Sequence, residues 1–233
     1  MQYQGGKTRL AKDIAKLIRE HGRGKTTYIE PFMGGASVLA EVAPSFDNVV
    51  AADKCEDIVL LWKAAIDGWV PPVSVSQEEY KSARNMAPSA VRGFIRFGCS
   101  FGAKWFGGYA KNNSGTNYAA QASRGVVKKA SNFRHAELFH CEYNDRLLRI
   151  NPQCCVYYMD PPYAGTTEYG AAKGFDHVAF WHHCSSLVAL GAVVLVSEYS
   201  APPEWRHVYE KKHRQTLNLN EGRATTEKVF VHI

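Results

Sequence analysis

The chain has 233 residues, of which 45% are hydrophobic and 12% aromatic, so it can bury one sizeable core. Its formal net charge of +6 is compatible with a nucleic-acid partner but does not require one. No apolar run approaches the length of a membrane-spanning helix, and the six cysteines form no Cys-x-x-Cys pair. We therefore expect a cytoplasmic protein with reduced cysteines, no membrane partner and no metal site.

The N-terminal third predicts alternating helices and strands. Apolar residues recur at helical spacing over residues 8–20, and two short apolar runs after them favour strands. In chain order we expect a helix over residues 8–20, a strand over 28–30, a glycine turn at 34–35, a helix through Val42, a strand over 48–52 and a helix over 56–67. This order is typical of an α/β unit whose first strand leads through a glycine turn into a helix.

An acid, Asp53, ends the second of these strands, 23 residues after Glu30. In nucleotide-binding units, an acid about 20 residues after the glycine turn accepts hydrogen bonds from ribose hydroxyls. The turn lacks the Gly-x-Gly-x-x-Gly pattern of dinucleotide sites, and Gly5-Gly6-Lys7-Thr8 lacks the first glycine of a phosphate loop. The pattern therefore does not favour a nicotinamide dinucleotide, and no phosphate site is needed if the ligand is an adenosine without phosphates.

The segment from Lys81 to Ala136 contains ten Lys or Arg and eight aromatic residues but no Asp or Glu. Cations neutralise phosphates, and rings stack on bases or wedge between them, so this composition favours a nucleic-acid surface. The alternative is a solvated basic loop with a few core rings. Gly, Ser and Asn are dense over residues 107–125, where we expect a flexible loop.

The α/β pattern resumes after this segment. The expected elements are a strand over residues 137–143 that ends in Glu142-Tyr143, a strand over 154–159, a helix over 180–190, a strand over 192–197 and a hairpin of residues 216–219 and 229–233 around Asn220-Glu221-Gly222. The whole chain therefore predicts an α/β fold that one basic and aromatic segment interrupts.

The most informative local pattern is Asp160-Pro161-Pro162-Tyr163, directly after an apolar strand. The prolines end the strand and fix the directions of the backbone carbonyls. An acid and an aromatic ring are thus held at the carboxyl end of a strand, where α/β sheets bind ligands. A planar substrate with an amino group suits this set, because it can donate to Asp160 and to a carbonyl while it stacks on Tyr163.

Four motifs follow one another in a recognisable order: Tyr3-Gln4-Gly5-Gly6-Lys7, Glu30-Pro31-Phe32-Met33-Gly34-Gly35-Ala36-Ser37, Ala52-Asp53-Lys54 and Asp160-Pro161-Pro162-Tyr163. Together they resemble the Dam-type, D12 class DNA adenine-N6 methyltransferases, and the resemblance covers essentially the whole chain. Residues 164–177 and 196–199 resemble the compact branch that phages and prophages often carry. The motifs leave open whether the protein works alone or with a restriction nuclease.

This resemblance implies a Rossmann-like methyltransferase sheet with helices on both faces, built from residues 1–66 and 137–233. Residues 67–136 would form an inserted target-recognition lobe. The implied cofactor is S-adenosylmethionine, and the residues implied to bind it are Tyr3, Gly6, Lys7, Glu30, Phe32, Gly34, Asp53, Glu142, Tyr143 and Asp160. The implied catalytic residues are Asp160, Pro161, Pro162 and Tyr163. Glu142 stands where the family more often has Asp.

The implied reaction transfers a methyl group to N6 of an adenine in double-stranded DNA, and the target base must first be flipped out of the duplex. Tyr163 would stack on that base, and Asp160 and the Pro161 carbonyl would accept hydrogen bonds from its amino group. The residues predicted to contact DNA are Arg92, Arg96, Lys104, Lys111, Arg124 and Lys128. The first three are candidates for reading a guanine, although phosphate contact suits most of the six.

Two alternatives stay open. One is the same chemistry on RNA or on cytosine N4, and the other is a non-catalytic nucleic-acid-binding protein that retains the fold. Asp160 favours adenine, because cytosine-N4 relatives more often have Ser there, and intact Lys7 and Tyr163 argue for catalysis. The absence of a Pro-Cys dipeptide argues against methylation of cytosine C5 through a thiol. The loop over residues 164–174 is predicted to close over the flipped base, with an ordinary surface loop as the alternative.

Overall fold

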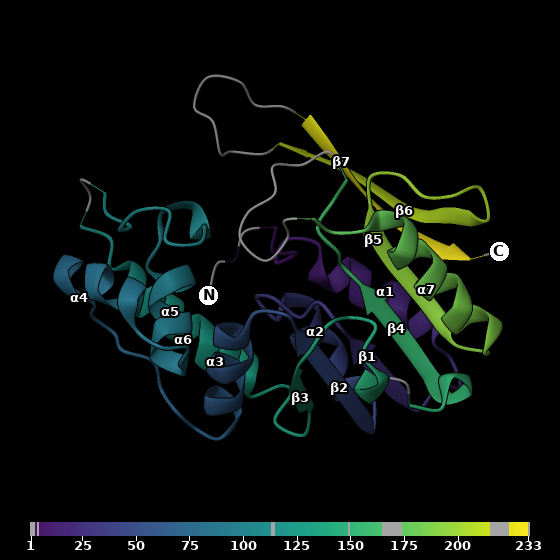
Figure 1. Cartoon of the computed structure of the whole chain (residues 1–233), viewed down its shortest axis with the longest axis horizontal. Helices are drawn as coiled ribbons and strands as arrows, with labels where there is room; N and C mark the ends of the chain where they lie inside the picture. Colours follow the sequence, from purple (N-terminus) through teal and green to yellow (C-terminus); the bar gives the residue numbers. More distant parts are fainter. Residues whose placement is uncertain are drawn as a thin grey trace.

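The protein is described by a computed structural model that covers residue 3 and residues 5–112, 115–148, 150–164, 174–214 and 224–232. Within this part of the chain, seven strands form one sheet in the order β3-β2-β1-β4-β5-β7-β6 (Figure 1). The strands from β3 to β5 pair in parallel, whereas β7 runs antiparallel to both β5 and β6. None of the described helices has the length and hydropathy needed to cross a membrane.

The strands are β1 (Thr27–Glu30), β2 (Asn48–Asp53), β3 (Glu137–His140), β4 (Cys155–Met159), β5 (Val193–Glu198), β6 (Trp205–Arg214) and β7 (Ala224–His232). The helices are α1 (Ala11–His21), α2 (Ser37–Val42), α3 (Glu56–Ile66), α4 (Gln77–Ser82), α5 (Ala90–Gly98), α6 (Tyr118–Ala130) and α7 (His177–Ala189). Short 3-10 helices are η1 (Ala43–Ser45), η2 (Ala83–Asn85), η3 (Phe101–Ala103), η4 (Arg146–Leu148) and η5 (Pro152–Cys154).

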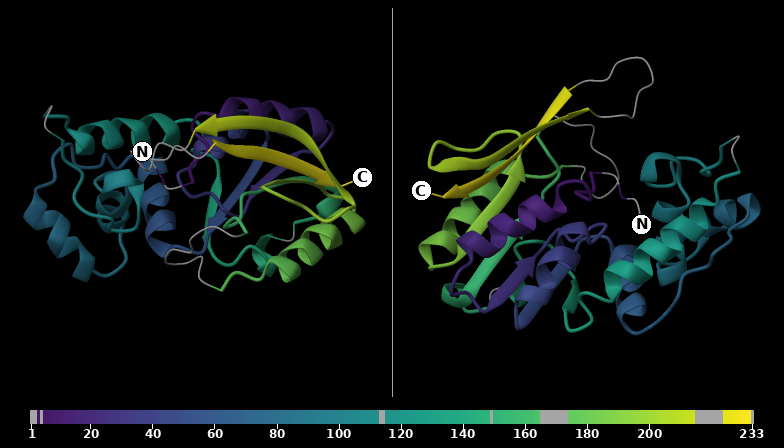
Figure 2. Two further views of the ribbon diagram at one scale, coloured as in Figure 1. Left: turned by 90° about the horizontal axis from the view of Figure 1, so that it is seen from above. Right: turned by 180° about the vertical axis from the view of Figure 1, so that it is seen from behind.

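The sheet is covered on both faces because side chains alternate along each strand. Tyr28 and Tyr158 contribute to a core shared with α1, α2 and α3, and their neighbours Ile29 and Tyr157 contribute to a core with α7. Figure 2 shows α1 and α7 on opposite sides of the strands. Both β1 and β4 are buried along their whole length, as expected of central parallel strands. The predicted α/β sheet with helices on both faces is thus confirmed.

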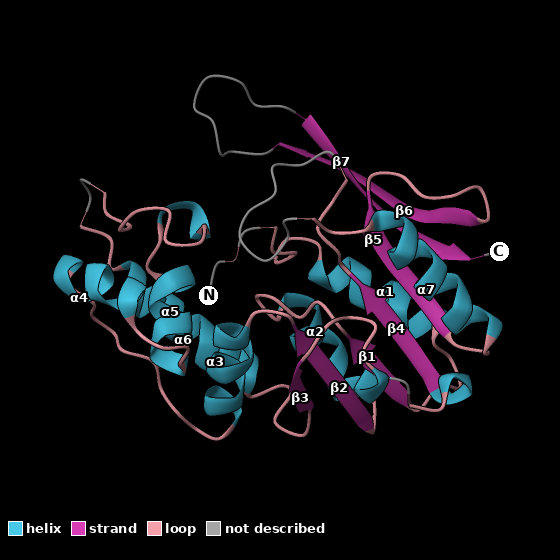
Figure 3. Cartoon of the chain, viewed as in Figure 1, coloured by secondary structure: helices cyan, strands magenta, loops and turns pink. Residues whose placement is uncertain are grey.

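Residues 67–136, which include the basic and aromatic segment, form the helices α4, α5 and α6, which lie beside α3 at the β3 end of the sheet (Figure 3). Gly93 lets α5 approach α3 closely, because a Cβ there would overlap the carbonyl oxygen of Asp57. The indole of Trp62 on α3 meets the ring of Phe133 edge to face, with centroids 5.5 Å apart. The helical lobe formed by α4, α5 and α6 therefore packs against α3, which covers one face of the sheet. The lobe and the sheet share this hydrophobic core.

Two local expectations are wrong. Residues 118–125, expected in a flexible loop, lie in α6, because Asn117 caps the helix through Ala120 N and small residues such as Ala122 bury one face. The first strand of the C-terminal hairpin, β6, begins earlier than expected, while residues 216–219 lie outside the described part of the chain. The sequence of β6 is too rich in charged residues to predict a strand, and pairing with β7 stabilises it.

Candidate active site

The strand order reverses between β1 and β4, which are parallel neighbours with sequence connections leaving in opposite directions. In open α/β sheets a ligand binds at such a switch point, outside the carboxyl ends of the strands. Glu30 ends β1, and Asp160 follows β4 directly. The fold therefore brings these two acids, far apart in the sequence, to one edge of the sheet.

Lys7 is the cation at this edge. Its Nζ lies 2.8 Å from Oδ1 of Asp160 and donates to the carbonyl oxygen of Gly5 at 3.2 Å, although the side chain is only 7% exposed. The same ammonium lies 4.6 Å from the centroid of the Tyr163 ring, within the range of a cation–π contact. The structure thus joins Lys7, Asp160 and Tyr163 in one cluster, with Pro161 buried and Pro162 half-buried between the acid and the ring.

Burial governs the protonation of this cluster. It raises the pKa of Asp160 to about 6, although the positive charge of Lys7 opposes the shift. For Lys7, burial alone would lower the pKa, but the carboxylates of Asp160 and Glu227 outweigh it and raise the pKa. Asp160 is therefore a carboxylate near neutral pH that remains close to its titration range, which suits an acceptor of hydrogen bonds and protons.

A second acid lies beside the segment that follows Tyr163. Glu198, at the end of β5, accepts the backbone N–H of Ala164 at 3.1 Å and that of Tyr199 at 2.7 Å. Burial raises the pKa of Glu198 to about 7. The ring of Tyr199 meets the ring of Tyr163 nearly at a right angle, with centroids 4.7 Å apart. Glu198 therefore fixes the backbone on both sides of the aromatic pair.

The glycine turn after β1 is tied to the end of β2. Asp53 accepts the N–H of Gly34 at 2.9 Å and that of Cys55 at 2.8 Å, and burial raises the pKa of its carboxyl to about 6. Gly34 has a positive φ of 41°, and a Cβ there would come within 2.7 Å of the Tyr3 ring. Tyr3 therefore packs directly on the turn, which requires glycine for both reasons.

The other predicted cofactor residues flank this turn. Glu30 is 2% exposed and accepts the Tyr28 hydroxyl, and burial raises the pKa of Glu30 well above its ordinary value. Phe32 stacks on Tyr143, with ring centroids 5.5 Å apart and planes inclined by 21°. Glu142, by contrast, is half exposed and pairs with Lys54 at 2.7 Å. Tyr143 thus contacts Phe32 in the turn after β1, whereas Glu142 pairs with Lys54 after β2.

Sequence reasoning counted Lys129 only as one of ten basic residues. In the structure its Nζ leaves α6 and donates to the Gly35 carbonyl at 2.6 Å and to the Ser37 hydroxyl at 2.8 Å. Burial lowers the pKa of Lys129 to about 8. Lys129, from the helical lobe, therefore stabilises the glycine turn. No local sequence motif predicts this contact.

The structure places Arg96, which was predicted to contact DNA, in the interior of the helical lobe. Its side chain is 1% exposed, forms an ion pair with the equally buried Asp57, and lies under the ring of Trp105. Arg92 also pairs with Asp57, at 2.8 Å, and is 16% exposed. The sequence of α5 alone does not indicate these ion pairs, because their acidic partner, Asp57, lies on another helix.

The remaining predicted DNA contacts lie at the surface of the lobe. Lys111, Arg124 and Lys128 are exposed, and Lys104 is half-buried. Among the rings of the segment, Phe101 and Trp105 are 64% and 42% exposed. The rings of Phe94, Phe97 and Phe133 are buried in the core instead, so they are not available to bases.

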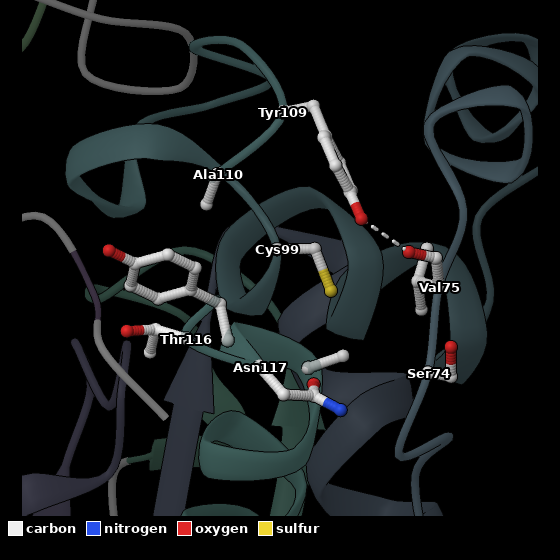
Figure 4. Close-up of a pocket in the computed structure, with 9 residues that line it drawn as sticks. Ser74, Val75, Cys99, Tyr109, Ala110, Thr116 and Asn117 are labelled. Carbon is white, nitrogen blue, oxygen red and sulfur yellow. Dashed lines mark hydrogen bonds between the residues drawn. The ribbon is translucent and has the colours of Figure 1, made fainter. Parts of the chain in front are cut away.

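A cavity of about 200 Å³ lies inside the lobe, between the chain before α4, the end of α5 and the start of α6 (Figure 4). Cys99 and Tyr109 line it, and the Tyr109 hydroxyl donates to the Val75 carbonyl at 2.7 Å. It is formed by residues of the lobe alone and not by the sheet edge. Among the described residues, no group of three or more His, Cys, Asp or Glu is placed to hold a metal ion.

Residues 3–90 match the family model of the D12 class N6 adenine-specific DNA methyltransferases. The matched region contains the N-terminal lysine, the glycine turn and the acid that ends β2. The resemblance expected from the motifs is therefore confirmed over residues 3–90, which include three of the four motifs. No curated protein matches the chain in sequence.

Solved structures with a similar course of the chain are distant. A hypothetical protein of Thermus thermophilus has a TM-score of 0.44 and 13% identity, covering 97% of this chain and 85% of that one. A precorrin-6y C5,15-methyltransferase of Geobacter metallireducens has a TM-score of 0.42 and 7% identity over 95% and 87%. An rRNA methylase of Streptococcus thermophilus has a TM-score of 0.41 and 8% identity over 94% and 93%.

Proposed function

We propose that the chain methylates N6 of adenine in double-stranded DNA by base flipping, and the match of residues 3–90 to the D12 class N6 adenine-specific DNA methyltransferases supports this proposal. The observation that carries this proposal is the cluster of Asp160, Tyr163 and Lys7 at the switch point of the sheet. It combines a carboxylate, a stacking ring and a rigid carbonyl, the groups that an exocyclic amine on a flat base requires.

The residues present fit the proposed cofactor. Asp53 is a carboxylate held at the end of β2, where ribose hydroxyls would donate to it, and Phe32 with Tyr143 offers aromatic surface to an adenine ring. Gly34 and Gly35 let Tyr3 pack directly on the turn, because a Cβ at either position would come within 2.7 Å of its side chain. When bound, S-adenosylmethionine supplies an electrophilic methyl group on a positively charged sulfur. The Asp160 carboxylate, at the same edge of the sheet, suits a cationic ligand.

The chain's own residues then act on the flipped adenine. Tyr163 stacks on the base, while Asp160 and the Pro161 carbonyl accept the two N–H bonds of the amino group. These hydrogen bonds orient the N6 lone pair and raise its electron density, and orientation alone can contribute several kcal/mol. The pKa of Asp160, raised by burial to about 6, also suits it to take up the proton that N6 releases when the new N–C bond forms.

We assign the DNA interface to the helical lobe. Its exposed cations would neutralise phosphates, and Phe101 and Trp105 offer exposed rings to the bases. Both rings lie on a tightly turned segment, in which Ala103 and Phe106 have positive φ values of 54° and 44°. Non-glycine residues rarely adopt this conformation, and strain of this kind concentrates at functional sites. The segment is closed by a 2.8 Å hydrogen bond from Phe101 N to Gly108 O.

We also propose relaxed sequence specificity. Of the three side chains considered for reading guanine, Arg92 and Arg96 direct their guanidinium groups to Asp57. A bidentate contact to guanine needs those same donors. The lobe therefore contacts mainly the sugar-phosphate backbone of the DNA, and the recognised sequence extends over few base pairs.

The test is transfer of labelled methyl groups from S-adenosylmethionine to unmethylated duplex DNA, to single-stranded DNA and to RNA of the same sequence, followed by digestion to nucleosides. N6-methyldeoxyadenosine from the duplex is the expected product. N4-methyldeoxycytidine, or label in RNA alone, would assign the same chemistry to another substrate. Cofactor binding without transfer to any of the three would support a non-catalytic role.

A further inference from the structure

The last described strand returns to the candidate active site. Glu227 lies on β7, which pairs antiparallel with β5 so that Glu198 stands opposite Lys228. Its neighbour two positions on, Val229, packs into the core with α1, and side chains two apart on a strand share a face. Glu227 therefore points to the face on which Lys7 enters, and it is only 4% exposed.

Glu227 contacts two members of the cluster at once. Its Oε1 accepts the hydroxyl of Tyr163 and lies 3.5 Å from Nζ of Lys7. Lys7 in turn lies 2.8 Å from Asp160. The carboxylate thus connects the outer end of the Tyr163 ring to the cation that pairs with the catalytic acid.

Glu227 is not needed to neutralise the charge of Lys7. Asp160 already forms the shorter ion pair with Lys7, and burying a second carboxylate beside the first is costly unless it is hydrogen-bonded. The hydrogen bond it accepts comes from the phenol. That hydroxyl also lowers the pKa of Asp160, so it interacts with the same carboxylate. Because Glu227 accepts the Tyr163 hydroxyl instead, the Asp160 carboxylate has more acceptor capacity left for a substrate amine.

We infer that Glu227 is a positioning residue, which holds the Tyr163 ring by its hydroxyl and keeps Lys7 and that hydroxyl from saturating Asp160. The inference rests on the proposed function, since it assigns Tyr163 to the flipped base and Asp160 to its amino group. It assigns a role in the reaction to a strand that carries none of the sequence motifs.

The test separates the acceptor from the charge. Glu227→Gln keeps an oxygen that can accept from Tyr163 but removes the charge, whereas Glu227→Leu removes both. In single-turnover methyl transfer to adenine, we expect Glu227→Leu to lower the rate by about 10²-fold, as misplacing a reacting group by an ångström does, with cofactor affinity unchanged. Glu227→Gln should retain most of the rate. Glu210→Leu, on the exposed side of the same hairpin, is the matched control and should match the wild type.

The pH profile gives a second readout that a purely structural role would not move. Asp160 is faced by Lys7, Glu30 from β1, Tyr158 from β4, Tyr163, Glu198 from β5 and Glu227 from β7. The negative charge of Glu227 raises the pKa of Asp160 beyond the effect of burial. Glu227→Gln should therefore shift the acidic limb of the rate profile to lower pH.

Tyr163→Phe tests the same hydrogen bond from the other side, and the pH profile of Glu227→Gln remains as the readout if Glu227→Leu does not fold. In a Tyr163→Phe background, Glu227→Leu should cost far less than it does in the wild type, because the shared contact is already lost. A wild-type rate and pH profile in both Glu227 variants, or full additivity with Tyr163→Phe, would overturn the inference. Failure of the wild type to methylate adenine would instead contradict the proposed function.

Discussion

Lys7 and Asp160 form a 2.8 Å ion pair that joins the N-terminal segment to the end of β4. The two residues come from the first and the last of the four motifs in the sequence, and only the reversal of strand order at β1 and β4 brings them together. Because both side chains are largely buried, the pair fixes the charge of the acid that the proposed mechanism uses.

Lys7→Met should raise the pH at which methyl transfer begins. Burial already raises the pKa of Asp160 to about 6, and Lys7 is the largest opposing influence, so its loss raises that pKa further. The carboxylate must be ionised to accept from the amine, and activity therefore appears as pH rises through the pKa. Single-turnover rates between about pH 5 and 9 measure the inflection, with exposed Lys16→Met as the control. An unchanged inflection would contradict this role for Lys7.

Arg96→Met should unfold the protein more easily without altering which DNA is recognised. It leaves Asp57, which is 2% exposed, with one partner fewer in the core, and loss of one member of a buried ion pair costs about 3–5 kcal/mol. Urea unfolding measures the loss. The double variant Asp57→Asn/Arg96→Met should recover part of the stability, because the charge left without an ionic partner is then that of Arg92, which is 16% exposed, and not that of the buried Asp57. Relaxed discrimination at one base pair in folded Arg96→Met would restore a base-reading role.

Lys128→Ala and Arg124→Ala should weaken DNA binding evenly across sequences. Each exposed cation that contacts a phosphate contributes about 0.9 to the slope of log affinity against log salt. Titrations of duplex DNA at several salt concentrations measure that slope. Lys16→Ala removes the same charge from α1, outside the lobe, and should leave the slope unchanged. Equal effects of the three substitutions would show that the lobe is not the interface.

Phe101→Ala should reduce DNA affinity by about 1–3 kcal/mol, the usual contribution of one base stacked on an aromatic side chain. The ring is 64% exposed, so its removal costs the fold little. Val178→Ala, at a 69% exposed position on α7, is the control for loss of an exposed apolar group. Phe101→Trp should retain binding, and binding equal to that of the wild type in Phe101→Ala would remove this ring from the interface.

The sheet and its ligand edge were predictable because their signals are local. An apolar run stopped by two prolines defines the end of β4, and the glycine turn with Asp53 defines the edge of β1 and β2. Helix α6 was missed because glycine, serine and asparagine outweigh its small buried residues in a local reading. Strand β6 was missed because pairing with β7, not an apolar pattern, stabilises its charged sequence.

Contacts between distant segments account for the rest of what the sequence could not predict. Glu227 reaches Tyr163 only through the register of antiparallel β7 on β5, and Lys129 reaches the glycine turn only through the packing of α6. Arg96 looked like a DNA contact because its partner, Asp57, lies on another helix. The loop over residues 164–174, predicted to cover the flipped base, lies mostly outside the described residues.

The most direct test of the account maps methylated bases by sequencing after incubation of unmethylated genomic DNA with the wild type, with Asp160→Ala and with the exposed control Asp176→Ala. We predict N6-methyladenine at short, relaxed sites with the wild type and the control, and none with Asp160→Ala. Methyladenine at wild-type levels in Asp160→Ala, or methyl groups found only on cytosine, would contradict the central claim.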